Sequence, residues 1–228
     1  EPWIDYIDRS THAIKTKIGN SALVNTAEVQ CPKSITEEDR ARAQMYQLLG
    51  ALLGSPPSAE LLSGLATLKG DDSSLGSASK QLAALAARTS PEISEREYHN
   101  LFVGLGRGEL LPYASYYLTG FLNEKPLAAL RRAMAAKGMQ RSDTVFEPED
   151  SMASLMEMMG AMIVGRFGRP AEISEQKDFF NTYIRPWAAH FYTDLEEARN
   201  SVFYAPVGTV GRVFMSVEAE AFRMSGAE

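Results

Sequence analysis

The chain has 228 residues, of which 45% are hydrophobic and 23% charged, and this composition excludes disorder over most of its length. A formal net charge of −6 argues against a general nucleic-acid binder and suits a cationic partner, although simple solubility also explains it. The single cysteine, Cys31, excludes an intramolecular disulfide and a cysteine metal cluster.

Neither a membrane span nor a secretory signal is visible in the sequence. The longest strongly apolar stretches, such as Leu48–Leu53, are far too short to cross a bilayer. A lone cysteine fits a reducing compartment. These features predict a cytoplasmic protein.

Residues 1–35 differ from the rest of the chain, because they are mixed and polar and their helical pattern is weak. Trp3, Ile7, Ile14 and Ile18 have only roughly helical spacing. We interpret this stretch as an N-terminal arm or an added extension. The remainder, residues 36–228, is predicted to be one helical domain.

The first strong helix pattern begins at Thr36, which is a good N-cap because acidic residues follow it in the first turn. Apolar residues then recur at helical spacing and define one face: Ala41, Met45, Leu48, Leu49, Leu52 and Leu53. Gly54 and Pro56 are expected to end this helix.

Further helices are predicted along the whole domain. We expect helices at about 58–68, 76–89 and 113–122, and one that follows the capping-box spacing of Ser94 and Glu97. Two more are expected from Pro126 to Gly138 and from Pro148 to Val164. A helix from Ser174 should be interrupted at Pro186, and the last helix should carry Phe203, Val207, Val210, Phe214 and Val217. Residues 139–147 are predicted to form a connector. No convincing run of period-two strands is present, so the predicted fold is all-α with about nine or ten helices.

Residues that could support catalysis or hold a metal are scattered. His12, His99 and His190 are far apart, and Asp194, four residues after His190, is the nearest approach to a ligand pair. The glycine loop Gly104–Gly108 could cradle a phosphate only with a strand before it and a helix directly after it, so we favour a helix connection. The sequence therefore predicts no enzyme, no metal and no cofactor.

An aromatic segment, Leu111–Leu118, places Pro112, Tyr113, Ser115 and Tyr116 at a predicted helix start. Helix starts offer free N–H groups, and aromatic rings there can hold an apolar ligand. Ordinary capping and core packing explain the same pattern.

An acidic segment, Phe146–Met152, contains Glu147, Pro148, Glu149, Asp150 and Ser151. Three acids in one helical turn exceed what capping needs, so a cationic ligand is one interpretation and a well-capped surface helix is the other. The helix behind it carries Met152, Met156, Met158, Met159 and Met162, a stripe that suits either the core or an adaptable binding surface.

These two segments, taken together, resemble motifs of the TorD/DmsD family of chaperones that mature molybdenum-containing redox enzymes. The family motif E-P-x-D-H is similar to Glu147-Pro148-Glu149-Asp150, with Ser151 in place of the usual His. The family's P-W-x-S-x-Y-L-like segment is similar to Pro112–Leu118, with Tyr113 in place of Trp. The resemblance extends over about residues 36–225.

The resemblance implies an all-helical, TorD-like chaperone that binds the twin-arginine signal peptide or the apo form of its client until the cofactor is inserted. The implied peptide-binding residues are Pro112, Tyr113, Ser115, Tyr116, Glu147, Pro148, Glu149, Asp150 and Ser151. A monomer or a domain-swapped dimer is compatible with it. Two alternatives are an assembly chaperone of the nitrate reductase type for a non-exported subunit, and a nucleotide-dependent enzyme that uses the glycine loop.

Overall fold

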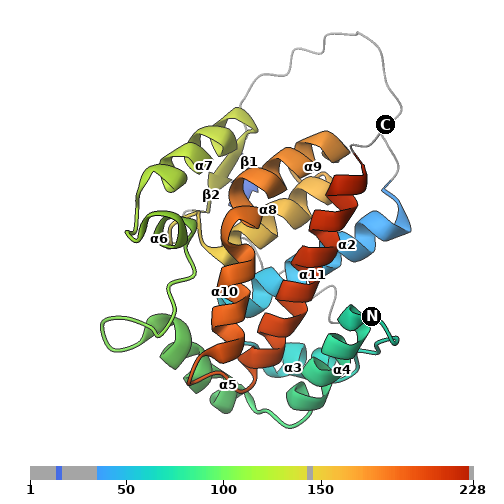
Figure 1. The fold of residues 1–228 in the computed structure, drawn as a ribbon, viewed down its shortest axis with the longest axis vertical. Coiled ribbons are helices and arrows are strands. Elements are labelled where there is room, and N and C mark those ends of the chain that lie inside the picture. The colour runs from blue at the N-terminus through green and yellow to red at the C-terminus, as the bar shows by residue number, and fades with distance from the viewer. Residues whose placement is uncertain (1–13, 17–34, 143–145, 226–228) are drawn as a thin grey trace.

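The computed structural model describes residues 14–16, 35–142 and 146–225, and it is helical almost throughout (Figure 1). The described residues form ten α-helices, two short π-helical segments (η1 and η2) and two three-residue strands. In chain order these are β1 Ile14–Thr16, α2 Glu37–Gly54, α3 Ala59–Leu65, α4 Ser74–Ala86, α5 Pro91–Tyr98, η1 His99–Val103, α6 Ala114–Thr119, α7 Lys125–Ala136, β2 Met139–Arg141, α8 Met152–Val164, α9 Ile173–Phe179, η2 Phe180–Ile184, α10 Arg185–Glu197 and α11 Tyr204–Met224. The all-α prediction is confirmed.

Serine and threonine side chains define where several helices begin. The Thr36 hydroxyl accepts from the Asp39 N–H at 3.0 Å, as its sequence context predicts. Ser90 caps α5 in the same way, so the predicted capping box of Ser94 and Glu97 is wrong. The Ser94 hydroxyl instead donates to backbone carbonyls of the preceding turn, and Glu97 lies in the last turn of the helix.

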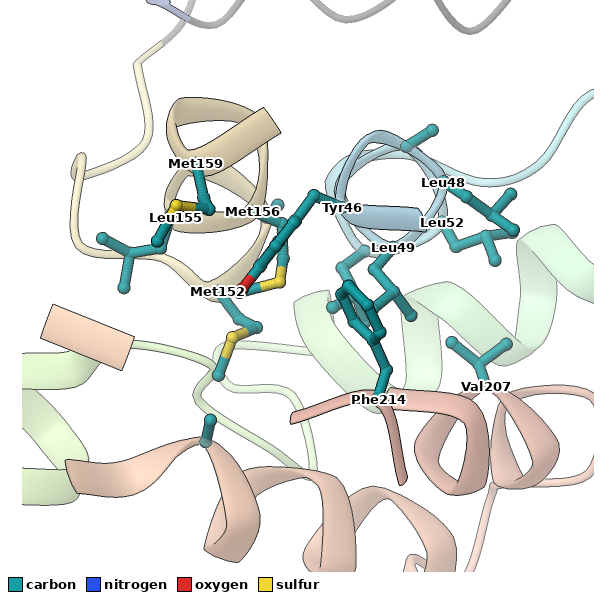
Figure 2. Close-up of a cluster of buried hydrophobic side chains, with 14 of the residues drawn as sticks. Tyr46, Leu48, Leu49, Leu52, Met152, Leu155, Met156, Met159, Val207 and Phe214 are labelled. Carbon is teal, nitrogen blue, oxygen red and sulfur yellow. The ribbon is translucent and has the colours of Figure 1, made fainter. Parts of the chain in front are cut away.

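The centre of the core is the contact between α2 and α8. Figure 2 shows Tyr46 reaching from α2 toward Met152 and Met156 of α8, with Phe214 of α11 beside it. The Tyr46 and Phe214 rings meet edge to face at 4.8 Å. All five methionines of α8 are buried, so the methionine stripe belongs to the core.

A glycine on each helix permits α2 and α8 to approach closely. A Cβ atom at Gly50 would lie 3.3 Å from the Ala153 carbonyl oxygen. A Cβ atom at Gly160 would lie 3.2 Å from the Ala43 carbonyl oxygen. Any side chain at either position would therefore push the two backbones apart.

The predicted faces of the first and last helices need correction. Ala41 is exposed, whereas Ala43, Tyr46 and Gln47 are buried, because α2 is enclosed on several sides beyond its second turn. In α11 the predicted core residue Val217 is exposed. Its neighbour Glu218 is buried, because it pairs with Arg42 of α2.

The helix through Pro186 is interrupted as predicted. Helix α9 passes into the π-helical segment η2, and α10 then restarts with Pro186 in its first turn. A π-helical turn accommodates the missing N–H of proline by shifting the hydrogen-bond pattern.

Strand β1 joins residues of the predicted arm to the helical domain. It pairs antiparallel with β2, which lies in the predicted connector, with Ile14 opposite Arg141 and Thr16 opposite Met139. The helical spacing noted for Ile14 is thus wrong at that residue. The assignment of residues 1–35 as an arm stays a prediction, because most of them lie outside the described residues.

Candidate functional site

The two segments singled out in the sequence meet in the structure. Tyr113 and Ser151 form an isolated antiparallel bridge. The Ala114 N–H donates to the Asp150 carbonyl at 2.9 Å, and the Met152 N–H donates to the Pro112 carbonyl at 2.8 Å. Helices α6 and α8 therefore begin side by side, at Ala114 and Met152.

Asp150 caps a helix other than the one that follows it. Its side chain is only 1% exposed, and its Oδ2 accepts from the Ser115 N–H in the first turn of α6 at 2.8 Å. Ser151 caps α8 instead, since its hydroxyl accepts from the Ser154 N–H at 3.1 Å. The predicted helix start at Pro148 is thus wrong, and the three acids precede α8 rather than lie in its first turn.

Two buried polar atoms at this crossing have no hydrogen-bond partner among the described residues. They are Ser115 Oγ and Asp150 Oδ1, on side chains already joined through the Ser115 N–H. Unpaired buried polar atoms are uncommon and disfavoured. This polar crossing includes the Asp150 carboxylate, whose other oxygen accepts a hydrogen bond that joins the two segments.

Replacing Asp150 should reveal this structural role. We expect Asp150→Ala to cost about 1–3 kcal/mol, because the buried Ser115 N–H loses its acceptor. Asp150→Asn should cost much less, since its amide oxygen can still accept from the Ser115 N–H. Chemical denaturation of both variants measures the difference, and equal losses would contradict this account.

Glu149 is already paired and buried. Its Oε2 lies 2.8 Å from Arg131 Nη2 of α7, and its Oε1 lies 3.8 Å from Arg141 Nε of β2. It therefore holds the acidic segment against α7 and β2. A carboxylate with two arginine neighbours has little left to offer a cationic ligand.

Glu147 is the carboxylate that faces outward. The Glu147 residue is exposed to solvent. Even so, the protein atoms around its carboxylate partly desolvate it, and this raises its pKa. Burial, together with the negative charges of Glu147 and Asp150, raises the pKa of Tyr113 to about 12. Glu147 thus lies close to Tyr113, and no described side chain forms an ion pair with it.

Tyr113 lies near this carboxylate, Phe146 precedes it in the chain, and further aromatic residues lie in and just after α6. Tyr113 and Tyr116 are half-buried, and the Tyr116 hydroxyl accepts from Arg107 Nη2 at 2.8 Å. Phe146 is 86% exposed and Phe121 68% exposed. The methionines of α8 contribute nothing to this surface, so the idea that they could meet an apolar ligand is wrong.

The glycine loop does not have the geometry of a phosphate cradle. The π-helical segment η1 precedes it, and the next helix, α6, begins only at Ala114. Gly104 and Gly106 have φ of 61° and 89°, so they serve a tight turn. Arg107 of the loop lies over the Tyr116 ring at 5.3 Å.

The part of the chain that the structure describes contains no cluster of three His, Cys, Asp or Glu side chains that could hold a metal ion. Asp194, the potential partner of His190, accepts instead from the Tyr117 hydroxyl at 2.8 Å. His12 and Cys31 lie outside the described residues. Within the described ranges, no helix combines the length and apolar character that a membrane span needs.

Comparison with known proteins defines the class. The solved structure of a protein assigned to redox enzyme maturation, from Archaeoglobus fulgidus, matches with a TM-score of 0.54 at 21% identity, over 77% of this chain and 93% of that one. This is the fold of redox-enzyme maturation proteins. The family model described as nitrate reductase delta subunit matches residues 68–193, and the chain belongs to this family.

Curated relatives agree with this assignment. The chaperone protein TorD of Aliivibrio fischeri is 25% identical over 207 residues, covering 82% of this chain and 96% of the relative. The chaperone protein TorD of Vibrio cholerae is 27% identical over 171 residues, covering 70% and 71%. The TorD-like resemblance inferred from the motifs is thereby confirmed.

Sequence reasoning missed the partners that fix the site. Arg131 and Arg141 were not predicted to hold Glu149, and Glu97 was not predicted to bind distant N–H groups. No local pattern marks these residues, because each partner lies many positions away in the chain. The structure brings Tyr113, Ser115 and Asp150 together, while their role in binding a peptide stays a prediction.

Proposed function

We propose that this protein is a cytoplasmic chaperone for a molybdenum-containing redox enzyme, which binds the client's twin-arginine signal peptide or its apo form until the cofactor is inserted. It acts by binding and not by catalysis. The observation that best supports this proposal is the exposed carboxylate of Glu147, which lies beside Tyr113 and next to the exposed ring of Phe146.

This surface matches the chemistry of a twin-arginine leader. Such a leader carries two arginines next to an apolar stretch. Glu147 offers a partly desolvated negative charge, and charge complementarity in such a setting favours a guanidinium. Tyr113, Tyr116 and Phe146 offer apolar area for the adjacent stretch.

The remaining candidate residues support the surface rather than contact the leader directly. Asp150, Ser115 and Ser151 join the starts of α6 and α8. Glu149 anchors the segment through Arg131. The backbone carbonyls of Pro112 and Pro148 accept hydrogen bonds from Met152 and Ser151.

A titration with a synthetic leader tests the proposal. The probe is a peptide with two consecutive arginines followed by an apolar stretch, and calorimetry measures its affinity. We expect Glu147→Gln to weaken binding by about 2 kcal/mol, roughly thirtyfold, with a smaller loss at high salt. Tyr113→Ala should weaken binding with little salt dependence.

The matched control is Glu95→Gln, an exposed carboxylate on α5. It should leave the affinity unchanged. Burial raises the pKa of Glu147, so this carboxylate takes up a proton at a higher pH than an ordinary glutamate does. As the pH is lowered, the affinity for the peptide should therefore begin to fall earlier than an ordinary glutamate would predict. Parental affinity in both the Glu147 and Tyr113 variants would refute the assignment of the surface.

A second candidate function is assembly of a nitrate reductase-type subunit that is not exported. The observation that favours it is the nitrate reductase delta subunit family itself. Such a chaperone would bind its client without a twin-arginine leader. Binding of the apo client with no measurable affinity for the synthetic leader would favour this second function.

A further inference from the structure

A pocket of about 520 Å³ opens at the end of the molecule where α7, β2, α8 and α9 come together (Figure 1). Its volume lies within the range of small-molecule sites, about 300–1,000 Å³. The lining comes from the end of α7, the start of β2, the last turn of α8, the loop after it and the first turn of α9. None of these described lining residues belongs to the surface proposed to bind the leader.

The inner side of the pocket is apolar. Met139 and Met162 are only 4% and 3% exposed, and they form what we call the methionine wall. The half-buried side chains of Phe167 and Ala171 also line the pocket. Methionine sulfur is polarisable and makes favourable contacts with aromatic rings. A flat aromatic group is therefore the apolar body that suits this wall.

Two cations from different segments line the same pocket and share one carboxylate. Lys137 Nζ lies 3.1 Å from Glu175 Oε1, and Arg169 Nη1 lies 3.0 Å from Glu175 Oε2. The other described residues of the lining are uncharged. The pocket therefore has an excess of positive charge next to its apolar wall, and this combination favours an anion.

Both cations retain donors for a further acceptor. Besides Glu175, Arg169 Nη1 contacts only the Pro170 carbonyl, at 3.1 Å, and the Nε and Nη2 groups of Arg169 have no acceptor among the described residues. Those two groups form the edge of a guanidinium that can hold a carboxylate through two parallel hydrogen bonds. The Lys137 ammonium has three N–H groups, and Glu175 accepts from one of them. A second carboxylate can therefore bind without displacing Glu175.

We propose that this pocket binds a small aromatic carboxylate, with its ring on the methionine wall and its carboxylate between Lys137 and Arg169. Glu175 holds the two cations in place and at the same time weakens their attraction for the ligand, because it shares both of them. The inference goes beyond the proposed function and does not depend on it.

Naphthoate is a suitable probe, because it carries one carboxylate on a flat apolar body. Its binding to the full chain is measured by calorimetry, and naphthalenemethanol serves as the neutral comparison. We expect naphthoate to bind roughly tenfold more tightly than the alcohol at low salt, and the difference should shrink at high salt.

Glu175→Gln gives the most specific test of the charge arrangement. It removes the carboxylate that shares both cations, while its amide oxygen can still accept from the Glu172 N–H and keep the capping box of α9. We expect it to bind naphthoate roughly three- to tenfold more tightly, and Arg169→Gln to bind it more weakly by a similar factor. Arg132→Gln removes an equal charge from an exposed position of α7 outside the described lining, and it should leave the affinity unchanged.

The location is tested by filling the opening. Ala136 lines the pocket from the last turn of α7 and is itself exposed, so Ala136→Trp should lower the affinity for naphthoate by roughly tenfold or more. Ala135→Trp places the same side chain on the adjacent exposed position, outside the described lining, and should bind as the parent does. Thermal melting followed by circular dichroism verifies that both variants are folded.

Three results would each overturn the inference. The first is naphthoate binding no more tightly than the alcohol, and the second is equal affinity in the folded Ala136→Trp and Ala135→Trp variants. The third is parental affinity in both Glu175→Gln and Arg169→Gln, since the pocket would then have no site for an anion. The leader peptide takes no part in these measurements, so their failure leaves the proposed function untouched.

Discussion

Glu97→Ala is expected to lower the free energy of unfolding by about 2–5 kcal/mol, although Glu97 lies far from the candidate site in sequence. Its carboxylate accepts three backbone N–H groups at the start of α11, those of Val202 at 2.7 Å, Phe203 at 3.1 Å and Tyr204 at 2.7 Å. The Phe203 and Tyr204 residues are buried, so their N–H groups would lose an acceptor that water cannot replace.

The expected loss corresponds to a fall in melting temperature of roughly 10 °C for a chain of this size. Glu97→Gln should give an intermediate loss, because one amide oxygen still accepts while the amide N–H group faces the Phe203 N–H. Glu95→Ala, on the exposed side of the same helix, is the matched control. A Glu97→Ala variant that melts with this control would show that the start of α11 does not need the carboxylate.

The helices could be predicted because their signals are local. Thr36 with its following acids fixes the start of α2, and the glycine and prolines after it fix the end. The spacing of Phe203, Val207, Val210 and Phe214 defines the buried face of α11 in the same way. Each pattern spans one element and needs no knowledge of its neighbours.

The errors occurred where a residue of one element serves another. Asp150 looks like part of the helix that follows it, but its carboxylate caps α6. Glu218 falls outside the apolar pattern, yet it is buried because Arg42 comes from the other end of the domain. Glycine pairs such as Gly50 and Gly160 also acquire their meaning only where two helices cross. Such long-range pairings are not encoded in periodicity.

The candidate site could be predicted from the sequence only in part. Its two segments could be chosen from the sequence because aromatic residues at one helix start and acids at another are unusual for simple capping. Which acid faces outward could not be predicted, since the answer depends on Arg131 and Arg141. These arginines engage Glu149, and Glu147 is the exposed carboxylate of the segment.

Breaking the buried pair of Arg42 and Glu218 should have an effect as large as that of Glu97→Ala. Glu218 is only 1% exposed, and it accepts from Arg42 Nε and Nη2 at 2.8 Å each and from the Tyr46 hydroxyl at 2.9 Å. Glu218→Ala leaves the largely buried Arg42 guanidinium with the longer ion pair to Asp39, at 3.3 Å, and Arg42→Ala leaves the Glu218 carboxylate buried without its cation. We expect each to cost about 3–5 kcal/mol by chemical denaturation.

Removing both charges together should recover most of this loss. In the variant Arg42→Met, Glu218→Met and Tyr46→Phe, apolar side chains of similar size replace the network, and no buried polar group is left without a partner. We expect its stability to lie within about 2 kcal/mol of the parent. Glu220→Ala, which breaks the exposed pair with Arg223 on the same helix, should have no measurable effect.

If the triple variant is as unstable as either single variant, the network stabilises α2 against α11 by more than the avoidance of an unpaired charge. In that case Arg42 and Glu218 would determine how the two helices are positioned, and variants of the pair should also broaden the unfolding transition. If the triple variant recovers, the large single losses reflect only the penalty for stranding one charge in the core. The two outcomes assign different roles to the same ion pair, and the denaturation midpoint and slope distinguish them.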